Sequence, residues 1–563
     1  MNSKERLSRL LAQIYGPETG SEVLPRLQHL LTNYQPRLPS PAQMSLTEKQ
    51  VVLITYGDQV TEPGTPPLRT LANFCTHYLP GVVDTIHILP FYPYSSDDGF
   101  SVIDYMAVDP ALGNWDDVAA LRTHFRLMFD AVLNHVSAQS DWFQAFLRDD
   151  PTYRDYFVVV EPDTDVSAVF RPRALPLLTR VKTAVSEKLV WTTFSEDQID
   201  LNYRNPDVLL KAIEILLHYI SHGAEYIRLD AVAFLWKEIG TNCLHRPQTH
   251  AIIQLIRAVL DIVAPQVVLI TETNVPHEEN IAYFGDGTNE AQMVYNFSLP
   301  PLTLHAFHTG QAETLSQWAS NLKRPSGRAT FFNFLASHDG IGLTPAKGIL
   351  TETDISRMCA RILELGGYVS YRTQTDGTQS PYELNINYLD ALGDPARPNE
   401  PIDLIARRFL TAHAIMLSLA GVPGIYFHSL FGSRSWPEGV HLSGHKRRIN
   451  RQKFNRTELE AELNNPTSLR HLVYKGFVQL LQARRHDPAF HPMGEQAVLF
   501  LHSGVFSLLR LAKNGRSAVL CLHNITPSPQ TITLSPKQLP IPLPATATDL
   551  LSHYPLTIHT PWH

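Results

Sequence analysis

The chain has 563 residues, 44% of them hydrophobic and 18% charged, which is typical of a folded globular protein that is too long for a single ordinary core. Its formal net charge of -7 leaves no basic surface of the kind that nucleic-acid binding needs, and no stretch approaches the roughly 20 apolar residues of a membrane-spanning helix. The four cysteines have no framework spacing, so we expect reduced thiols and a cytoplasmic protein.

An amphipathic helical pattern comes first in the chain. Apolar residues recur at i, i+3 and i+4 from Leu7 to Ile14 and again from Leu24 to Leu31, and three prolines between Pro36 and Pro41 then end the pattern. We therefore expect a helical extension over residues 1–49. The pattern does not decide whether this extension covers the main domain or a partner subunit, so a homodimer stays among the expected assemblies.

Short apolar strands alternate with amphipathic helices from residue 50 onward. Such alternation predicts an α/β fold with a parallel sheet, and about eight units over this length favour a closed (β/α)8 barrel of the TIM type over an open doubly wound sheet. In that fold the reactive groups belong at the carboxyl ends of the strands. The strand candidates are Val51–Thr55, Thr85–Leu89, Leu127–Val132, Tyr226–Leu229, Val267–Thr271, Thr330–Leu335 and Gly424–Phe427.

Two stretches interrupt this alternation, and the end of the chain differs from it in character. Residues 141–203 and 340–401 are expected to form inserted subdomains, termed B and B′, that shape the substrate mouth. They divide the barrel into residues 50–140, 204–339 and 402–487. Residues 488–563 predict a C-terminal antiparallel β domain, whose strand candidates are Ala497–Leu501, Val505–Leu511, Ser517–His523 and Gln530–Leu534.

Three carboxylates follow three of the predicted barrel strands: Asp230, Glu272 and Asp339. Arg228 lies two residues before Asp230 and shares its face of the strand, so we expect it to lower the pKa of Asp230; a plain salt bridge at a strand end is the alternative. Such a set suits retaining glycosyl transfer, in which one carboxylate attacks the anomeric carbon, a second protonates the leaving oxygen and a third grips the sugar hydroxyls. We assign these roles to Asp230, Glu272 and Asp339 in that order, and the role of Glu272 requires a raised pKa.

Two histidines accompany these carboxylates. His135 follows the third predicted strand, and His338 directly precedes Asp339; each is either a further contact to the sugar hydroxyls or an ordinary hydrogen-bonded histidine. Although the chain has 25 histidines, they form no HExxH motif, and the cysteines form no Cys-x-x-Cys pair. We expect no metal and no organic cofactor.

Four segments in chain order, DAVLNH, IRLDAVAF, LITETN and FLASHDG, resemble the four sequence blocks of the α-amylase family of retaining α-glycoside enzymes. Other segments, among them HILPFYPYSSDDGFSVIDY, FRPRALPLLT and RRINRQKF, resemble the sucrose-phosphorylase-type subgroup of that family. The resemblance implies a hexosyltransferase that acts on a small α-glucoside and inorganic phosphate, forms a covalent glucosyl–Asp230 intermediate and releases α-D-glucose 1-phosphate. Asn134 stands where calcium-dependent members place a metal ligand, but one ligand does not make a calcium site.

By the same resemblance, Asp97 and Arg451 clamp the distal hydroxyls of the bound glucose, and Phe100 packs on its ring face. The alternatives are a turn acid for Asp97 and a solvated member of a basic stretch for Arg451. Arg173 resembles the phosphate-contacting arginine of the subgroup. Tyr382 resembles a tyrosine that the subgroup brings to the same pocket on a mobile loop, and a mere lid contact is its alternative.

The stretch Phe234–Glu238, the segment TETNVPHEENIAYFG and the leader helix look more like the glucosylglycerate phosphorylases of this subgroup than like sucrose phosphorylases. The resemblance therefore favours 2-O-α-D-glucosylglycerate as the substrate, with sucrose, sucrose 6-phosphate and glucosylglycerol as alternatives. A hydrolase or transglucosidase with the same carboxylates, and a barrel that only binds sugar, are the remaining interpretations. An acidic aglycone needs a cationic subsite, for which the candidates are Arg434, His445, Lys446, Arg447 and Arg448.

Overall fold

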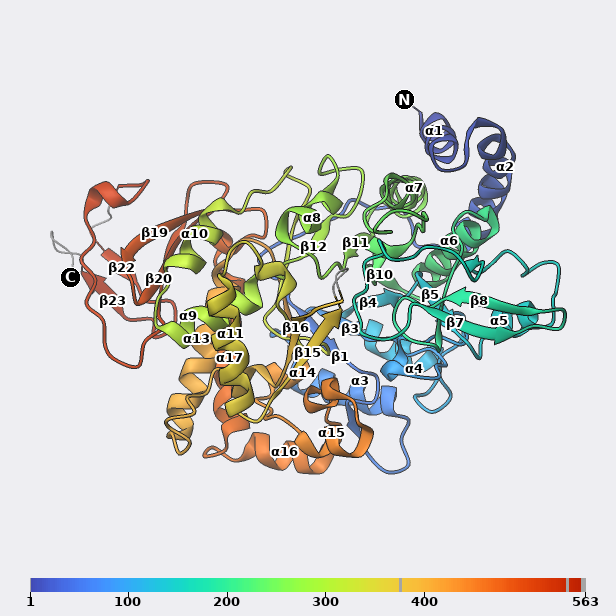
Figure 1. Cartoon of the computed structure of the whole chain (residues 1–563). Coiled ribbons are helices and arrows are strands. Elements are labelled where there is room, and N and C mark those ends of the chain that lie inside the picture. Colours follow the sequence, from blue (N-terminus) through green and yellow to red (C-terminus); the bar gives the residue numbers. More distant parts are fainter. Residues whose placement is uncertain (1, 374–376, 543–545, 558–563) are drawn as a thin grey trace.

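A closed barrel of eight parallel strands forms the centre of the molecule (Figure 1). The computed structural model describes residues 2–373, 377–542 and 546–557, so parts of the expected B′ subdomain and C-terminal domain lie outside the described residues. The predicted (β/α)8 barrel is confirmed, and its last strand pairs with its first. Around the barrel the order is β1 (Val52–Thr55), β3 (Thr85–Ile88), β4 (Arg126–Ala131), β10 (Ala224–Leu229), β11 (Val268–Thr271), β12 (Met293–Tyr295), β13 (Thr330–Asn333) and β17 (Val422–Tyr426).

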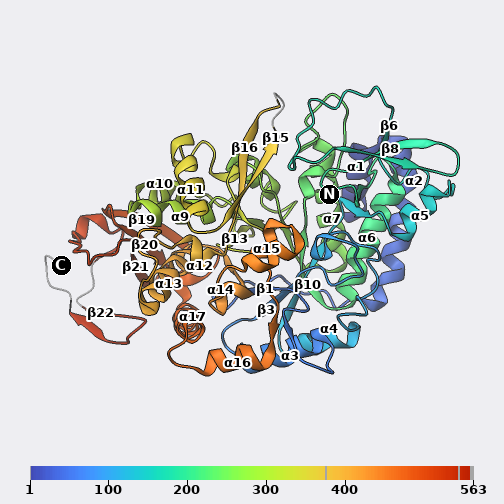
Figure 2. The same cartoon turned by 60° about the horizontal axis from the view of Figure 1, so that its bottom comes forward.

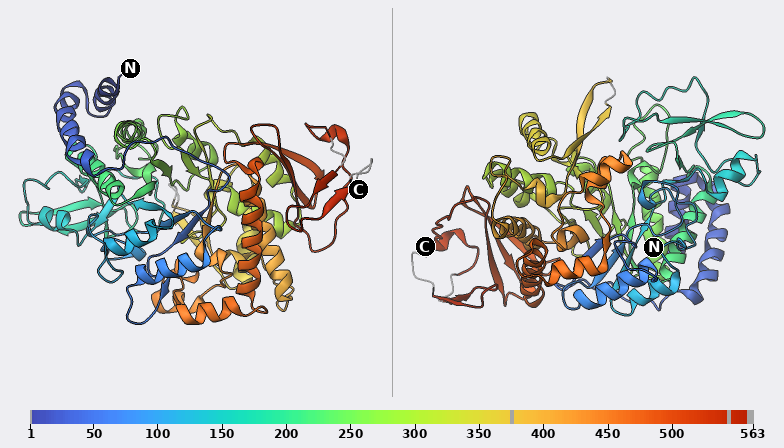
Figure 3. Two further views of the ribbon diagram at one scale, coloured as in Figure 1. Left: turned by 180° about the vertical axis from the view of Figure 1, so that it is seen from behind. Right: turned by 90° about the horizontal axis from the view of Figure 1, so that it is seen from below.

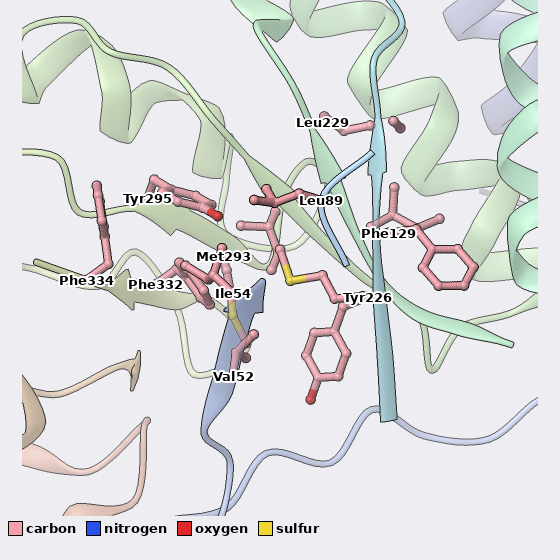
Figure 4. Packing of buried hydrophobic residues seen from close by; sticks show 14 of the residues in the cluster. Val52, Ile54, Leu89, Phe129, Tyr226, Leu229, Met293, Tyr295, Phe332 and Phe334 are labelled. Carbon is pink, nitrogen blue, oxygen red and sulfur yellow. The ribbon is translucent and has the colours of Figure 1, made fainter. Parts of the chain in front are cut away.

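Seven of these strands coincide with the candidates from the sequence, and β12 is the one that the sequence does not reveal. It has only three residues, and the apolar run continues beyond it toward the next helix, so no local pattern marks it. Every residue of β1, β11, β12 and β13 is buried, as expected for a parallel sheet that is covered on both faces. Figure 4 shows side chains that different strands contribute to this core, among them Ile54, Met293 and Phe332.

Helices surround the barrel, and local sequence explains where several of them begin. Asn114 and Asp117 form a capping box at the start of α4, and Asn205 caps α6, which has Pro206 in its first turn. Within the described residues, no helix is both long enough and apolar enough to cross a lipid bilayer. The main helices are α3 (Pro67–Tyr78), α4 (Trp115–Arg122), α6 (Pro206–Ser221), α7 (Pro247–Val263), α9 (Leu299–Thr309), α10 (Glu313–Asn321), α13 (Ile402–Ser418) and α17 (Leu469–His486), with shorter ones at α8 (His277–Ile281), α14 (Phe427–Leu430), α15 (Pro437–Ser443) and α16 (Arg456–Asn464).

The N-terminal extension folds as two helices, α1 (Ser3–Tyr15) and α2 (Pro17–Tyr34), that lie on the outside of the barrel (Figure 1). α1 packs against α7 and α2 against α6, which buries the leucines that form the predicted apolar stripe. Arg6 forms an ion pair with Asp261 at 2.6 Å, and the Tyr15 hydroxyl donates to the carbonyl of Tyr203 at 3.0 Å. The extension therefore covers the main domain of its own chain, which the sequence pattern left open.

Two insertions rise on the same side of the barrel (Figure 2 and the right view of Figure 3). Each follows the carboxyl end of a barrel strand, so both reach the end of the barrel where the predicted carboxylates lie. The first, after β4, contains β5 (His135–Ser137), α5 (Asp141–Leu147), β6 (Val159–Val160), β7 (Leu178–Lys182), β8 (Glu187–Trp191) and β9 (Gln198–Asp200). The second, after β13, contains β14 (Ile341–Gly342), α11 (Glu352–Glu364), β15 (Tyr368–Thr373), β16 (Gln379–Asn385) and α12 (Tyr388–Ala391).

A three-stranded antiparallel sheet closes the chain at the opposite end of the molecule from the N-terminal helices (left view of Figure 3). It consists of β19 (Glu495–His502), β20 (Val505–Leu511) and β21 (Ala518–Asn524) and packs on α10 and α13. The prediction of a strand over Gln530–Leu534 is wrong. Of these residues, Leu534 alone is assigned a bridge. Prolines flank this segment on both sides and keep it from extending along a sheet edge. A separate pair, β22 (Thr546–Thr548) and β23 (Pro555–Thr557), follows it.

Candidate active site

One cavity at the carboxyl end of the barrel gathers most of the side chains that the sequence singled out. We call it the central cavity, and an adjoining outer hollow shares part of its wall. Arg228 lies beneath the central cavity, and Arg451 lines the outer hollow instead. The predicted residues that line the central cavity are Asp97, Phe100, His135, Arg173, Asp230, Glu272, His338, Asp339 and Tyr382.

Arg228 holds the carboxylates from below. In the barrel sheet Arg228 of β10 is directly opposite Asp130 of β4, and its Nη1 donates both to Asp130 Oδ1 and, at 2.8 Å, to Asp230 Oδ1. Its Nη2 lies 4.0 Å from Glu272 Oε2. Asp130 Oδ2 in turn is bonded to Nε2 of His87 at 2.6 Å. Asp130 was not among the predicted site residues, because its position opposite Arg228 depends on how two distant strands align.

The prediction that the pKa of Asp230 lies below its usual value is wrong. Burial raises its pKa well above the usual value; Arg228 opposes this, while the negative charges of Glu272, Asp130 and Asp339 add to it. Burial also raises the pKa of Glu272, as predicted. The direct ion pair with Arg228 belongs to Asp230, at 2.8 Å, whereas the nearest Arg228 nitrogen lies 4.0 Å from Glu272, so within this pair Arg228 favours the ionised form of Asp230.

The loop after β10 links these two carboxyl groups a second time. Ala231 has a left-handed backbone with φ of 47°, which is uncommon for a residue with a side chain and ends the strand abruptly. Its backbone N–H donates to Glu272 Oε2 at 3.1 Å. Asp230 and Glu272 are therefore held to each other through main chain as well as through Arg228.

Asp339 remains ionised although its side chain is only 19% exposed. Desolvation raises its pKa, but the positive charges of Arg447, Arg451 and Arg228 lower it by more, so the net value lies well below the usual range. Nη1 of Arg447 contacts Asp339 Oδ1 directly. His338 stacks on Phe100 with 4.7 Å between ring centroids, and burial lowers the pKa of His338 to about 3, which keeps it neutral at physiological pH.

The loop after β3 brings two aspartates to the wall. Asp97 and Asp98 both have positive φ, at 52° and 51°, in a tight turn. Arg451 Nη1 lies 2.7 Å from Asp98 Oδ2 and 3.7 Å from Asp97 Oδ1, and its Nε donates to the carbonyl of His338 at 2.8 Å. Arg451 is only 2% exposed, so it is not a solvated member of the basic stretch. Arg451 therefore contacts Asp97 from outside the central cavity.

Part of the wall of the central cavity, which we call the acceptor wall, carries groups suited to an acceptor: Arg173, Asn274, Tyr382 and Arg447. Arg173 of the first insertion lies there, with Nη2 at 3.4 Å from Asp97 Oδ2. Tyr382 is part of β16 and lines the central cavity. Asn274, two residues after Glu272, was not among the predicted site residues; its Nδ2 lies 3.4 Å from the Tyr382 hydroxyl, and its Oδ1 has no hydrogen-bond partner among the residues that the structure describes.

Of the five cationic candidates for an acidic aglycone, Arg447 is the one that lines the central cavity. His445, Lys446 and Arg448 line the outer hollow, where Arg448 forms an ion pair with Asp98 at 2.6 Å. Arg434 lines neither and pairs with Asp390 at 2.6 Å. The structure therefore distinguishes between cationic candidates that could not be distinguished by their spacing in the sequence.

Asn134 is bound to a buried ammonium group. Lys237 Nζ donates to Asn134 Oδ1 at 2.7 Å and pairs with Asp200 Oδ2 at 2.6 Å, and Asn134 Nδ2 donates to the same Asp200 oxygen at 3.0 Å. The positive charge that balances Asp200 is thus supplied by the chain itself. In the part of the chain that the structure describes, no group of three or more His, Cys, Asp or Glu side chains is arranged to hold a metal ion.

Comparison with known proteins relates this geometry to described enzymes. Residues 77–344 match the model of the α-amylase catalytic domain. The chain is 51% identical over 534 residues to the glucosylglycerate phosphorylase of Spirochaeta thermophila, covering 93% of this chain and 90% of the relative. It is 31% identical over 472 residues to a sucrose phosphorylase of Agrobacterium vitis, covering 80% and 90%. The crystal structure of sucrose 6F-phosphate phosphorylase from Thermoanaerobacter thermosaccharolyticum superimposes with a TM-score of 0.72 at 25% identity, covering 86% of this chain and 98% of the other.

Proposed function

The chain belongs to the α-amylase family, and from this premise we propose that it transfers the α-D-glucosyl group of 2-O-α-D-glucosylglycerate to inorganic phosphate, releasing glycerate and α-D-glucose 1-phosphate. The observation that carries the proposal is the 51% identity to a glucosylglycerate phosphorylase over nearly the whole chain, against 31% to a sucrose phosphorylase. The central cavity supports it, because its lining includes four carboxyl groups, those of Asp97, Asp230, Glu272 and Asp339, and two arginines.

Two displacements at the anomeric carbon describe the reaction. Glu272 gives its proton to the glycosidic oxygen while a carboxylate oxygen of Asp230 bonds to C1, so that glycerate leaves and a covalent glucosyl ester forms. A phosphate oxygen then attacks C1, the ester bond to Asp230 breaks, and Glu272 takes the proton of the attacking phosphate. Each step inverts the configuration, so the α-anomer is retained. Asp339 accepts hydrogen bonds from the sugar hydroxyls as the ring flattens.

Phosphate has to compete with water for the same intermediate, and the acceptor wall provides cations for that purpose. Arg173 and Arg447 both line the central cavity, near Tyr382 and Asn274. A guanidinium has five N–H donors in a planar fork that matches phosphate and carboxylate oxygens. We assign the glycerate carboxylate and the incoming phosphate to this wall in turn. We assign contacts with the glucosyl hydroxyls to Asp97, His135 and His338, which also line the central cavity.

A product assay tests this proposal. Purified protein with 2-O-α-D-glucosylglycerate should release glucose 1-phosphate when phosphate is present, and little free glucose when it is absent. In the reverse direction, glucose 1-phosphate should glucosylate glycerate in preference to glycerol, fructose and fructose 6-phosphate. Equal release of free glucose with and without phosphate would show a hydrolase instead, and preference for another acceptor would reassign the aglycone.

Replacing Arg173 by alanine is expected to raise the KM for phosphate by about 10- to 100-fold, because one charge-assisted hydrogen bond contributes roughly 1.5–3 kcal/mol. The KM for the glucoside should change much less. Arg171 is a matched control from the same FRPR motif, because it lines neither the central cavity nor the outer hollow. Equal increases in both KM values would contradict the phosphate role and indicate that Arg173 acts through Asp97, which it contacts at 3.4 Å.

A further inference from the structure

Glu383 is a buried carboxylate that the reaction described above does not use. It belongs to β16, its side chain is 4% exposed, and it does not line the central cavity. Its two oxygens accept four hydrogen bonds: from the backbone N–H of Gly340 at 2.9 Å, from Asn385 Nδ2 at 3.0 Å, and from Arg447 Nη2 and Nε at 2.9 and 3.1 Å. A buried carboxylate with this many donors is held in one fixed orientation.

Arg447 connects Glu383 to the reacting carboxylates. The guanidinium forms a two-pronged pair with Glu383 through Nε and Nη2, and its remaining nitrogen, Nη1, contacts Asp339 Oδ1. The three residues come from separate segments: β16, the 3-10 helix Lys446–Asn450 and the loop after β13. Glu383 and Asp339 thus share one arginine.

The backbone of the second insertion holds Glu383 at this position. Directly after Asp339 the chain enters β14, where Gly342 pairs with Glu383 in the antiparallel ladder. Gly340 leaves the room that this requires, because a Cβ there would lie 2.5 Å from Cγ of Glu383. The ladder between β15 and β16 pairs Tyr371 with Pro381 and Ser370 with Glu383, so Tyr382 is the extra residue of a bulge. The bulge lets Tyr382 line the central cavity while Glu383 holds Arg447 beside it.

We propose that Glu383 is a positioning residue for glucosyl transfer: by binding Nε and Nη2 of Arg447, it restricts that arginine to one oxygen of Asp339 and leaves the other oxygen to the sugar. Without Glu383, the fork of Arg447 is free to close on both oxygens of Asp339, since this is the preferred geometry of an arginine–carboxylate pair. Asp339 then grips the distorted ring less well in the transition state. This inference rests on the proposed function, in which Asp339 stabilises that ring.

The test compares Glu383→Gln with Glu400→Gln, using α-D-glucosyl fluoride as the donor. Glu400 is a control from the same insertion, because its side chain is 7% exposed and pairs with Arg408 away from the central cavity. We expect Glu383→Gln to lower kcat about 10- to 100-fold and to leave the KM for glucosyl fluoride within about twofold of the wild-type value. The reason is that a misplaced Asp339 carboxylate, which acts in the transition state, affects kcat. Glu400→Gln should leave both constants unchanged. Glucosyl fluoride has no glycerate, so a wrong aglycone assignment would not affect this comparison.

A double-mutant cycle shows whether Glu383 acts through Arg447. If it does, adding Glu383→Gln to Arg447→Gln should lower kcat by no more than about twofold further. Fully additive losses, or a kcat for Glu383→Gln within twofold of the wild type, would overturn the proposal. Should Glu383→Gln not fold, Arg447→Lys tests the same point, because lysine keeps the charge but cannot bridge both carboxylates as a fork. An unchanged kcat in Arg447→Lys would overturn the proposal equally.

Discussion

Replacing Asp230 by alanine should reduce phosphorolysis by roughly 10⁵–10⁶-fold, the size of loss that follows removal of an enzyme's nucleophile. The other carboxyl groups in the described lining of the cavity are not expected to take its place, because Asp339 is bound to Arg447, Asp97 lies 3.4 Å from Arg173, and Glu272 is needed as the proton donor. The fold should survive, since Arg228 keeps its pair with Asp130 after the Asp230 carboxylate is removed. Glucose 1-phosphate release measured against time gives the rate.

Trapping supplies the second readout for this variant. A slow fluorinated glucosyl donor traps the covalent intermediate. In the wild type it should leave one sugar covalently bound to the peptide that contains Asp230, and in Asp230→Ala it should leave none. Glu225→Ala is a matched control on the same strand, because Glu225 pairs with Arg126 at the outer surface. Near wild-type turnover in Asp230→Ala, or a product of inverted configuration, would remove Asp230 from the role of nucleophile.

Features of the fold that have local signals could be predicted from the sequence. The barrel strands are apolar runs bounded by polar residues, and the carboxylates Asp230, Glu272 and Asp339 each follow such a run, so their meeting in the central cavity follows from the barrel alone. β12 could not be predicted, because a strand of three residues is too short to show a periodic pattern of apolar residues. The strand expected at Gln530–Leu534 had the right alternation, but of these residues only Leu534 is assigned a bridge.

The rest of the site depends on contacts between segments that are far apart in the chain. Arg447 meets Asp339, and Asp130 meets Arg228, through packing that no local pattern encodes. The pKa of Asp230 was predicted in the wrong direction because the Arg228 neighbour is visible in the sequence, whereas burial is not. The extent of burial decides the sign here, because desolvation and the neighbouring anions together outweigh one adjacent cation.

Replacing Glu272 by glutamine should separate proton donation from nucleophilic attack. Glycerate is a poor leaving group that needs a proton, so phosphorolysis of glucosylglycerate should fall about 10²–10⁴-fold, the range that general acid catalysis contributes. Fluoride leaves without that proton, so glucosylation of Asp230 by α-D-glucosyl fluoride should remain much closer to the wild-type rate. Glu278→Gln is the control, because Glu278 is exposed on α8 nearby. Burst kinetics with the fluoride donor would measure this step directly.

The pH dependence gives an independent check on Glu272. Burial raises its pKa, so the protonated form that donates to the leaving oxygen persists to higher pH than for an exposed glutamate. Wild-type kcat/KM for glucosylglycerate should therefore fall on the basic side as the pH rises through this raised pKa, and on the acid side as Asp230, whose pKa burial also raises, takes up a proton. With the fluoride donor, which leaves without that proton, this basic limb should be absent from the wild type and from Glu272→Gln alike. Equal losses with both donors, or an unchanged basic limb, would assign the proton transfer to another group in the central cavity.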